Sequence, residues 1–288
     1  MSTRRLLTLL TVCGAVGLPG CSSRDEPAAA PAADGGDARA GLQHIHGLGV
    51  DPGDGTLFVA THDGLYSARE GRRRVEPVGE VGQDIMGFSV VARDRFIGSG
   101  HPAPAQEDLP PNLGLIASRD RGRTWASVSL LGEADFHVLR SSGRRVYGFD
   151  GIQGRLMVSS SGGRDWQQRR PPAAMFDLAI APDDPDRIVV STERGLFASR
   201  DAGRRWRPLS STEAGLLAWP QDGLSLVGAD GTVQRSSDGG ATFDRVGQVA
   251  GPPSALTAAG GELYVALGDG TVVRSADGGA TWAVRATP

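Results

Sequence analysis

The chain of 288 residues contains no lysine, so its 30 cations are all arginines, and they stand against 33 Asp and Glu residues for a formal net charge of −3. Without a basic excess, nucleic acid is not an expected partner. Arginine-only usage is typical of a GC-rich genome. Aromatic residues make up 6% of the chain, whereas Gly at 42 and Pro at 18 are abundant. This composition excludes long helices and coiled coils and favours short strands joined by tight turns.

Cysteine is nearly absent, with only Cys13 and Cys21 in the chain. Cys13 lies in an apolar run, residues 6–16, that follows the basic pair Arg4-Arg5 and is too short to span a bilayer, as in a secretory signal peptide. The segment Leu18-Pro19-Gly20-Cys21 resembles a bacterial lipobox, in which cleavage before the cysteine leaves a lipidated N-terminus. Lipidation at Cys21 would leave the mature protein no thiol for a disulfide, so its fold has to be stable without one.

Three segments are therefore expected. Residues 1–20 form a signal peptide with a lipobox, and residues 21–40 form a flexible tether. The tether lacks aromatic residues after the cysteine and is rich in Ala, Pro and Gly, so it cannot bury a core. Residues 41–288 form the folded domain. We expect a monomer in the cell envelope, held by its N-terminal lipid on the extracytoplasmic side of the membrane.

An octet of the form S-x-D-x-G-x-T-W recurs along the folded domain. Copies begin at Ser67, Ser118, Ser159, Ser199, Ser236 and Ser275, at intervals of 51, 41, 40, 37 and 39 residues. Its acidic position holds Asp120, Asp201, Asp238 and Asp277, and its aromatic position holds Trp125, Trp166, Trp206, Phe243 and Trp282. The carboxylate can accept backbone N–H bonds across a tight turn, and the ring can pack between neighbouring sheets. Both roles are structural, so the octets predict fold and not chemistry.

Each repeat also carries four short strand signals, such as residues 42–50, 56–60, 64–68 and 74–78 in the first. Six units of four strands predict an all-β fold, a six-bladed β-propeller whose ring closure protects the sheet edges. The octets resemble the Asp-boxes, or bacterial neuraminidase repeats, of the propeller superfamily that includes the sialidases. The stretch from His44 to Tyr66, with Met86-Gly87-Phe88 and Gly100-His101-Pro102, also resembles an uncharacterised group of bacterial lipoproteins labelled glycosylhydrolase-like. How the ring closes stays open.

All five histidines fall in loops or strand ends that are expected at one face, opposite to the octet turns. Alignment of the innermost strands by repeat spacing gives one column, which reads His46, Met86, His137, Asp177, Leu216 and Leu256. Equivalent side chains of successive blades should form a ring around the central channel. The loops between the second and third strands add His62 and His101, and His44 lies two residues before His46.

Two interpretations compete for this face. Imidazole with a thioether suits copper, and imidazole with a carboxylate suits zinc, so a transition-metal site is one hypothesis. The candidate ligands are His46, Met86 and His137, with His44, His62, His101 and Asp177 as neighbours. The other interpretation is that these side chains bond loop backbone, as polar residues at channel mouths commonly do. A small molecule or a glycan is a further candidate ligand.

The resemblance to sialidases implies glycoside hydrolysis, which in that family uses three arginines, a tyrosine paired with a glutamate, and an aspartic acid/base. Here Tyr66, Tyr147 and Tyr264 fall in middle-strand patterns, and none of the family's catalytic residues can be placed on a position of this chain. Asp84 with Asp135 or Glu193 could still form an acid/base pair. A non-catalytic assembly or interaction module is the third alternative, because photosystem assembly factors and sortilin-type receptors are Asp-box propellers. The run Arg72-Arg73-Arg74 is expected to be solvated edge-strand charge.

Lipidation is tested at the one cysteine that the mature chain would keep. Cys21→Ser should release the protein from membranes into the soluble fraction or leave it uncleaved, because the thioether-linked lipid can no longer form. Membrane fractionation and the mass of the processed chain measure both effects. Unchanged fractionation together with a wild-type processed size would contradict the lipobox prediction.

Overall fold

The computed structural model describes residue 42 and residues 44–79, 81–210 and 214–288. The expected signal peptide and tether, residues 1–40, lie outside the described residues. All the described residues belong to one compact unit, Asp37–Pro288. Its described part is built of strands and turns, and no helix there is long and apolar enough to cross a membrane.

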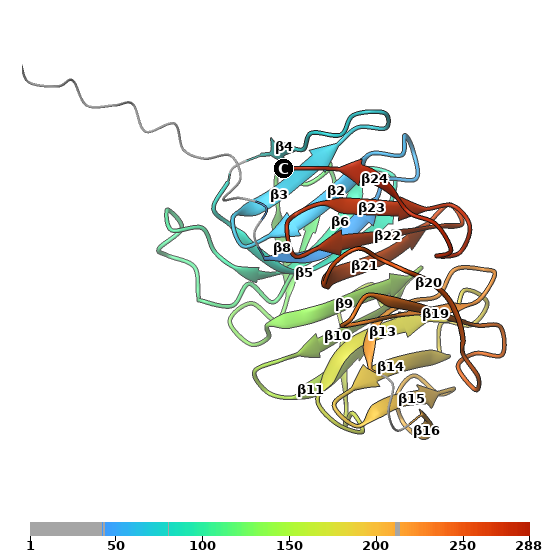
Figure 1. The fold of residues 1–288 in the computed structure, drawn as a ribbon. Coiled ribbons are helices and arrows are strands. Elements are labelled where there is room, and N and C mark those ends of the chain that lie inside the picture. The colour runs from blue at the N-terminus through green and yellow to red at the C-terminus, as the bar shows by residue number, and fades with distance from the viewer. Residues whose placement is uncertain (1–41, 43, 80, 211–213) are drawn as a thin grey trace, which may run out of the picture. The chain divides into compact units, whose positions relative to one another are not determined.

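Six four-stranded antiparallel sheets, each made of four consecutive strands, form the blades (Figure 1). Blade 1 is β1 (Ile45–Val50), β2 (Leu57–Thr61), β3 (Gly64–Ala68) and β4 (Glu76–Val78). Blade 2 is β5 (Asp84–Ala92), β6 (Arg95–His101), β7 (Leu115–Ser118) and β8 (Ala126–Ser129). Blade 3 is β9 (Phe136–Ser142), β10 (Arg145–Asp150), β11 (Arg155–Ser159) and β12 (Gln167–Arg169).

The second half of the ring repeats this pattern. Blade 4 is β13 (Met175–Ile180), β14 (Ile188–Thr192), β15 (Gly195–Ser199) and β16 (Arg207–Ser210). Blade 5 is β17 (Gly215–Ala218), β18 (Leu224–Gly228), β19 (Thr232–Ser236) and β20 (Asp244–Gln248). Blade 6 is β21 (Pro253–Ala259), β22 (Glu262–Leu267), β23 (Val272–Ser275) and β24 (Ala283–Ala286). The innermost strands of successive blades touch, and β21 touches β1, so the prediction of a six-bladed propeller is confirmed.

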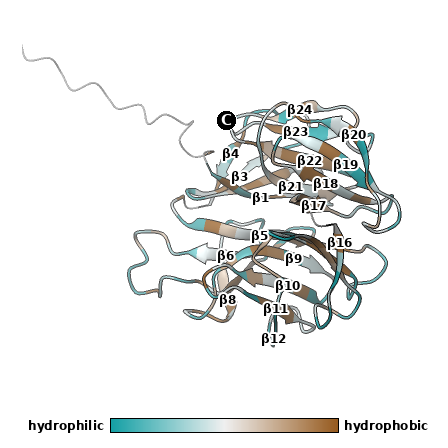
Figure 2. Cartoon of the chain, turned by 60° about the horizontal axis from the view of Figure 1, so that its bottom comes forward, coloured by the Kyte–Doolittle hydropathy of each residue, from teal (hydrophilic) through white to brown (hydrophobic). Residues whose placement is uncertain are grey.

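Burial follows the order of the strands within each blade. The second strands β2 and β14 are buried along their whole length, because neighbouring blades cover both of their faces. Their sequences, LFVAT and IVVST, are accordingly runs of apolar and small residues without a polar alternation. In Figure 2 the hydrophobic colour follows the inner and middle strands, and the hydrophilic colour follows outer strands and loops. The core is therefore divided among the spaces between blades.

The octets form the turns between third and fourth strands. In blade 2, the Asp120 carboxylate accepts bonds from the Thr124 amide at 3.0 Å, the Thr124 hydroxyl at 2.6 Å and the Ser118 hydroxyl at 2.8 Å. These donors favour the charged carboxylate, and the pKa of Asp120 falls to about 2. Gly122 holds a φ of 82° that only glycine adopts freely. Blades 5 and 6 repeat the bonds at Asp238 and Asp277, and in blade 3 the hydroxyl of Ser161 takes the place of the carboxylate.

Each octet aromatic packs against a different cluster between two blades. Trp125 lies between blades 1 and 2, Trp166 between 2 and 3, and Trp206 between 3 and 4. Phe243 and Trp282 occupy the next two spaces. All five rings are partly buried, since they cap the clusters from the rim. The space between blades 6 and 1 has no octet aromatic, because the octet that begins at Ser67 has Arg74 at its aromatic position.

Ring closure uses residues of the C-terminal segment in place of that aromatic. An apolar cluster joins Ile45, Leu57 and Val75 of blade 1 to Tyr264 and other residues of blade 6. The buried Arg285 side chain donates to the carbonyls of Ala68, Gly55 and Arg72 at 3.0–3.2 Å. The Thr287 amide donates to the Arg73 carbonyl at 2.8 Å. The ring is thus closed by side-chain packing and by backbone hydrogen bonds between the C-terminal segment and the β3–β4 segment of blade 1. Each sheet keeps four consecutive strands.

Truncation of one octet aromatic tests the inter-blade packing. Trp166→Ala should lower the free energy of unfolding by about 3 kcal/mol, the lower end of values for large aromatics because the ring is only partly buried. Urea unfolding followed by circular dichroism measures it. Trp166→Phe, which keeps most of the apolar contact, should cost less than half as much. Equal stability of Trp166→Ala and wild type would contradict the packing role.

Candidate functional site

The histidines lie at one end of blades 1 to 3. His44 precedes β1, and His46 lies within it; His62 is in the β2–β3 turn. His101 ends β6, and His137 follows the first residue of β9. Loops between second and third strands, and loops that lead into innermost strands, open at the same end of an antiparallel blade. The expectation that the histidines share a face therefore agrees with the strand order.

A β-bulge recurs near the start of five innermost strands. The pairing register shifts between Ile45 and Gly47 in β1, so His46 is the extra residue opposite β2. The same shift leaves one residue out of the pairing ladder in four other blades, namely Met86, His137, Phe176 and Ser254. A bulged side chain is redirected by the local twist, which is why bulges often lie next to binding sites. His46, Met86 and His137 are thus structural equivalents.

Register also separates Asp177 from this set. The bulged residue of blade 4 is Phe176, which is 53% exposed, so the equivalent of His137 in that blade is Phe176 and not Asp177. Asp177 is one residue further along, and a shift of one residue sends a strand side chain to the other face. It is buried and accepts bonds from Arg140 at 2.7 Å and from the amides of Leu178 and Leu217 at 2.8 Å. The structure therefore gives Asp177 a role in tying blades 3, 4 and 5 together.

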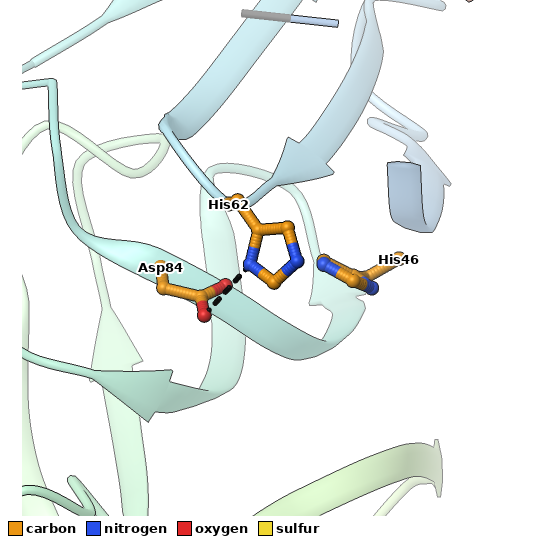
Figure 3. A group of neighbouring side chains, drawn as sticks. All are labelled: His46, His62 and Asp84. Atoms are coloured by element: carbon orange, nitrogen blue, oxygen red, sulfur yellow. Dashed lines mark ion pairs between the residues drawn. The ribbon is translucent and has the colours of Figure 1, made fainter. Parts of the chain in front are cut away.

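Three side chains from blades 1 and 2 converge at the channel mouth: His46, His62 and Asp84, here called the three-ligand cluster (Figure 3). One ligand atom from each lies within 4.8 Å of the others. His62 Nδ1 is 2.9 Å from Asp84 Oδ2, and the rings of His46 and His62 meet edge to face with centroids 4.3 Å apart. His44 lies beside the cluster, 5.3 Å from the His62 ring between centroids.

Two polar atoms of the cluster are buried without a hydrogen-bond partner among the described residues: His46 Nε2 and Asp84 Oδ1. Burial, and after it the neighbouring His62, lowers the pKa of His46 to about 4. His46 is therefore neutral at neutral pH, with a nitrogen lone pair that no proton occupies. Buried polar atoms without partners are unfavourable and call for an explanation. A cation between them would satisfy both.

A second polar group lies next to the cluster. The buried Asp135 carboxylate is 2.8 Å from His137 Nε2 and 3.8 Å from His101 Nε2. The bond with Asp135 raises the pKa of His137. His101 Nδ1 is in turn 2.8 Å from the Pro111 carbonyl oxygen. His101 is thus engaged with backbone and His137 with a carboxylate, whereas His46 has a free nitrogen.

Two small cavities follow the channel axis. The upper one, about 190 Å³, is lined by all six residues of the aligned column: His46, Met86, His137, Asp177, Leu216 and Leu256. The lower one, about 210 Å³, is lined mostly by apolar side chains. Arg140, held by Asp177, borders both. Of the three-ligand cluster, His46 lines the upper cavity, whereas His62 and Asp84 do not.

Sequence reasoning did not assign Asp84 as a ligand. It considered Asp84 with Asp135 only as an acid/base pair, although the innermost-strand alignment placed both residues two positions before the bulge. The tyrosines lie in middle strands as expected, away from the mouth: the Tyr147 hydroxyl donates to the Pro185 carbonyl at 2.7 Å, and the Tyr264 hydroxyl to Glu262 at 2.6 Å. Burial raises the pKa of Tyr264 to about 12. Neither tyrosine is placed as a nucleophile at the channel.

No family model and no curated protein matches this chain. Solved β-propeller structures do resemble it. YCF48, solved bound to a peptide, is 16% identical with a TM-score of 0.54 over 85% of this chain and 82% of that one. A GH74 xyloglucanase from Xanthomonas campestris is 18% identical with a TM-score of 0.55 over 85% of this chain but 45% of the xyloglucanase. A gluconolactonase from the same organism is 16% identical with a TM-score of 0.61, covering 80% and 86%. At these identities the likeness shows the propeller fold alone.

The protonation of the histidines is a direct test of the site. In metal-free protein, NMR titration should give His46 a midpoint near pH 4 and His137 a midpoint above its ordinary 6.5. Because the folded-state pKa of His46 is below its unfolded value, its stabilising contribution is complete above pH 6.5 and is lost as pH falls toward 4. His46→Gln assigns the signal. A His46 midpoint near 6.5 would show that the ring is solvated and the cluster open.

Proposed function

We propose that the protein binds a divalent transition-metal ion, zinc or copper, at the channel mouth through His46, His62 and Asp84. The observation that carries the proposal is the convergence of three ligand atoms within 4.8 Å from separate segments of two blades. Tetrahedral zinc, about 2.0–2.1 Å from each ligand atom, needs those atoms about 3.3–3.5 Å apart. Metal binding would therefore require side-chain rotations that bring the three ligand atoms to that spacing.

The electrostatics of the cluster support a cation. Neutral His46 offers its lone pair without first losing a proton, so metal binding there does not compete with protonation at neutral pH. Asp84 supplies the negative charge that two imidazoles lack. The buried atoms His46 Nε2 and Asp84 Oδ1, which lack partners among the described residues, would both gain one.

The donor set also bears on which metal is bound. Two imidazoles and a carboxylate are a zinc set with a fourth position left open. His46 borders the upper cavity of about 190 Å³, so a small ligand in that cavity would lie next to one of the three metal ligands. Met86 lines the same cavity, and its thioether as an additional ligand would favour copper.

The alternative of a glycoside hydrolase has less support. Its acid/base pair would need carboxylates free to act across a sugar, whereas Asp84 is paired with His62 and Asp135 with His137. We further propose that the chain is an Asp-box propeller, which the octet hydrogen bonds support, and that it is a monomer anchored in the envelope through Cys21. The lipobox motif supports that anchor.

Metal retention tests the proposal. The Asp37–Pro288 unit, loaded with zinc or copper and dialysed, should keep about one equivalent by elemental analysis. His46→Ala and His62→Ala should each weaken binding by at least about a hundred-fold, more than the loss of an outer-shell partner. His101→Ala is the matched control and should keep the metal, because His101 lies outside the cluster. Wild-type protein without metal, or equal retention in all three variants, would refute the site.

A further inference from the structure

A cavity of about 1000 Å³ lies between blade 1 and the octet turn of blade 2. Six arginines line it: Arg69, Arg72, Arg73, Arg74, Arg121 and Arg123. We call it the arginine groove. The groove is bordered by the β1–β2, β3–β4 and β7–β8 turns. His62 of the proposed metal site lies in the β2–β3 turn. In antiparallel blades these are opposite ends, so the groove is separate from the proposed metal site.

Among the described residues, Arg121 is the one arginine of the groove that forms an ion pair with a carboxylate. Both oxygens of Asp54 accept bonds from Arg121, at 2.9 and 3.2 Å, and this pairing lowers the pKa of Asp54 to about 2. The Glu70 carboxylate forms ion pairs with Arg274 at 3.1 Å and with Arg285 at 3.2 Å. Within the described residues, the four exposed arginines of the β3–β4 segment form no ion pair; they are Arg69, Arg72, Arg73 and Arg74. Glu76 is the remaining acid in the lining.

The backbone that carries these arginines is fixed by ring closure. The Arg72 amide donates to the Arg69 carbonyl at 2.9 Å, and the buried Arg285 side chain donates to the Arg72 carbonyl at 3.0 Å. The Thr287 amide donates a hydrogen bond to the Arg73 carbonyl at 2.8 Å, and Arg74 forms an isolated β-bridge with Thr287. The backbone of this segment is therefore held by bonds to the C-terminal segment, while its exposed arginine side chains line one cavity.

We propose that the arginine groove binds a phosphate-bearing anion. Guanidinium groups bind phosphate oxygens through two parallel hydrogen bonds, and several around one cavity suit a ligand with more than one negative charge. The net charge of −3 makes this local excess a property of the groove and not of the whole surface. The ligand is either a free phosphate compound or the headgroup of an anionic phospholipid, and both present the same oxygens.

The test uses two probes on the Asp37–Pro288 unit, which contains all six apolar clusters. Calorimetry with inorganic pyrophosphate represents free phosphate compounds, and co-sedimentation with phosphatidylglycerol vesicles, against phosphatidylcholine vesicles, represents headgroups. Arg72→Gln with Arg73→Gln should weaken the binding by about ten-fold or more, as expected when charged hydrogen bonds are lost. Arg200→Gln with Arg207→Gln removes the same charge from exposed positions of blade 4 and should change it less than about two-fold.

Binding of pyrophosphate that is lost only in the Arg72/Arg73 variant identifies a free phosphate ligand. Binding to phosphatidylglycerol vesicles alone, with the same loss, identifies a phospholipid headgroup. Binding of neither probe, or an equal loss in the blade 4 control, overturns the proposal. Circular dichroism and metal content of the same variants show that the fold and the channel mouth are intact, so failure here is distinguishable from failure of the metal site.

Discussion

Every other feature of this ring depends on the joint between blade 6 and blade 1. The other five spaces are each capped by an octet aromatic, but this one is held by an apolar cluster, by the buried Arg285 and by backbone bonds to Thr287. Without that joint, one apolar face of blade 1 and one of blade 6 would be open to solvent. The joint also fixes two parts of blade 1 that contribute to the proposed sites, the start of β1 and the Arg72–Arg74 segment.

The two proposed sites use this frame in different ways. The three-ligand cluster is shared by blades 1 and 2, so its geometry is set by how those blades pack, through Phe58, Phe88 and Phe96. The arginine groove lies between the same two blades at their other end. Metal at the first site would satisfy buried atoms that lack partners among the described residues, and an anion at the second would neutralise exposed arginines that line one groove.

Sequence reasoning predicted the fold because six octets at nearly equal spacing leave few alternatives, and the expected strands of blade 1 lie within three residues of the observed ones. It also placed the histidines on one face, since strand order alone decides that. It could not place Asp177, because repeat length varies: Phe176, the structural equivalent of His137, follows it by 39 residues and Asp177 by 40, and spacing alone does not choose between them. Closure was open for a related reason: Arg285 acts through carbonyls of distant turns, and no local pattern shows those contacts.

The recurrent bulge has a consequence for how such a ring can evolve. A bulged residue takes no part in strand pairing, and at His46, Met86, His137, Phe176 and Ser254 its side chain is not fully buried in the core. Replacement there changes the lining of the channel mouth while the ladders and the inter-blade clusters stay as they are. The frame and the lining of the channel mouth can therefore diverge independently, because substitutions at these unpaired positions exchange polar for apolar side chains without loss of a ladder hydrogen bond.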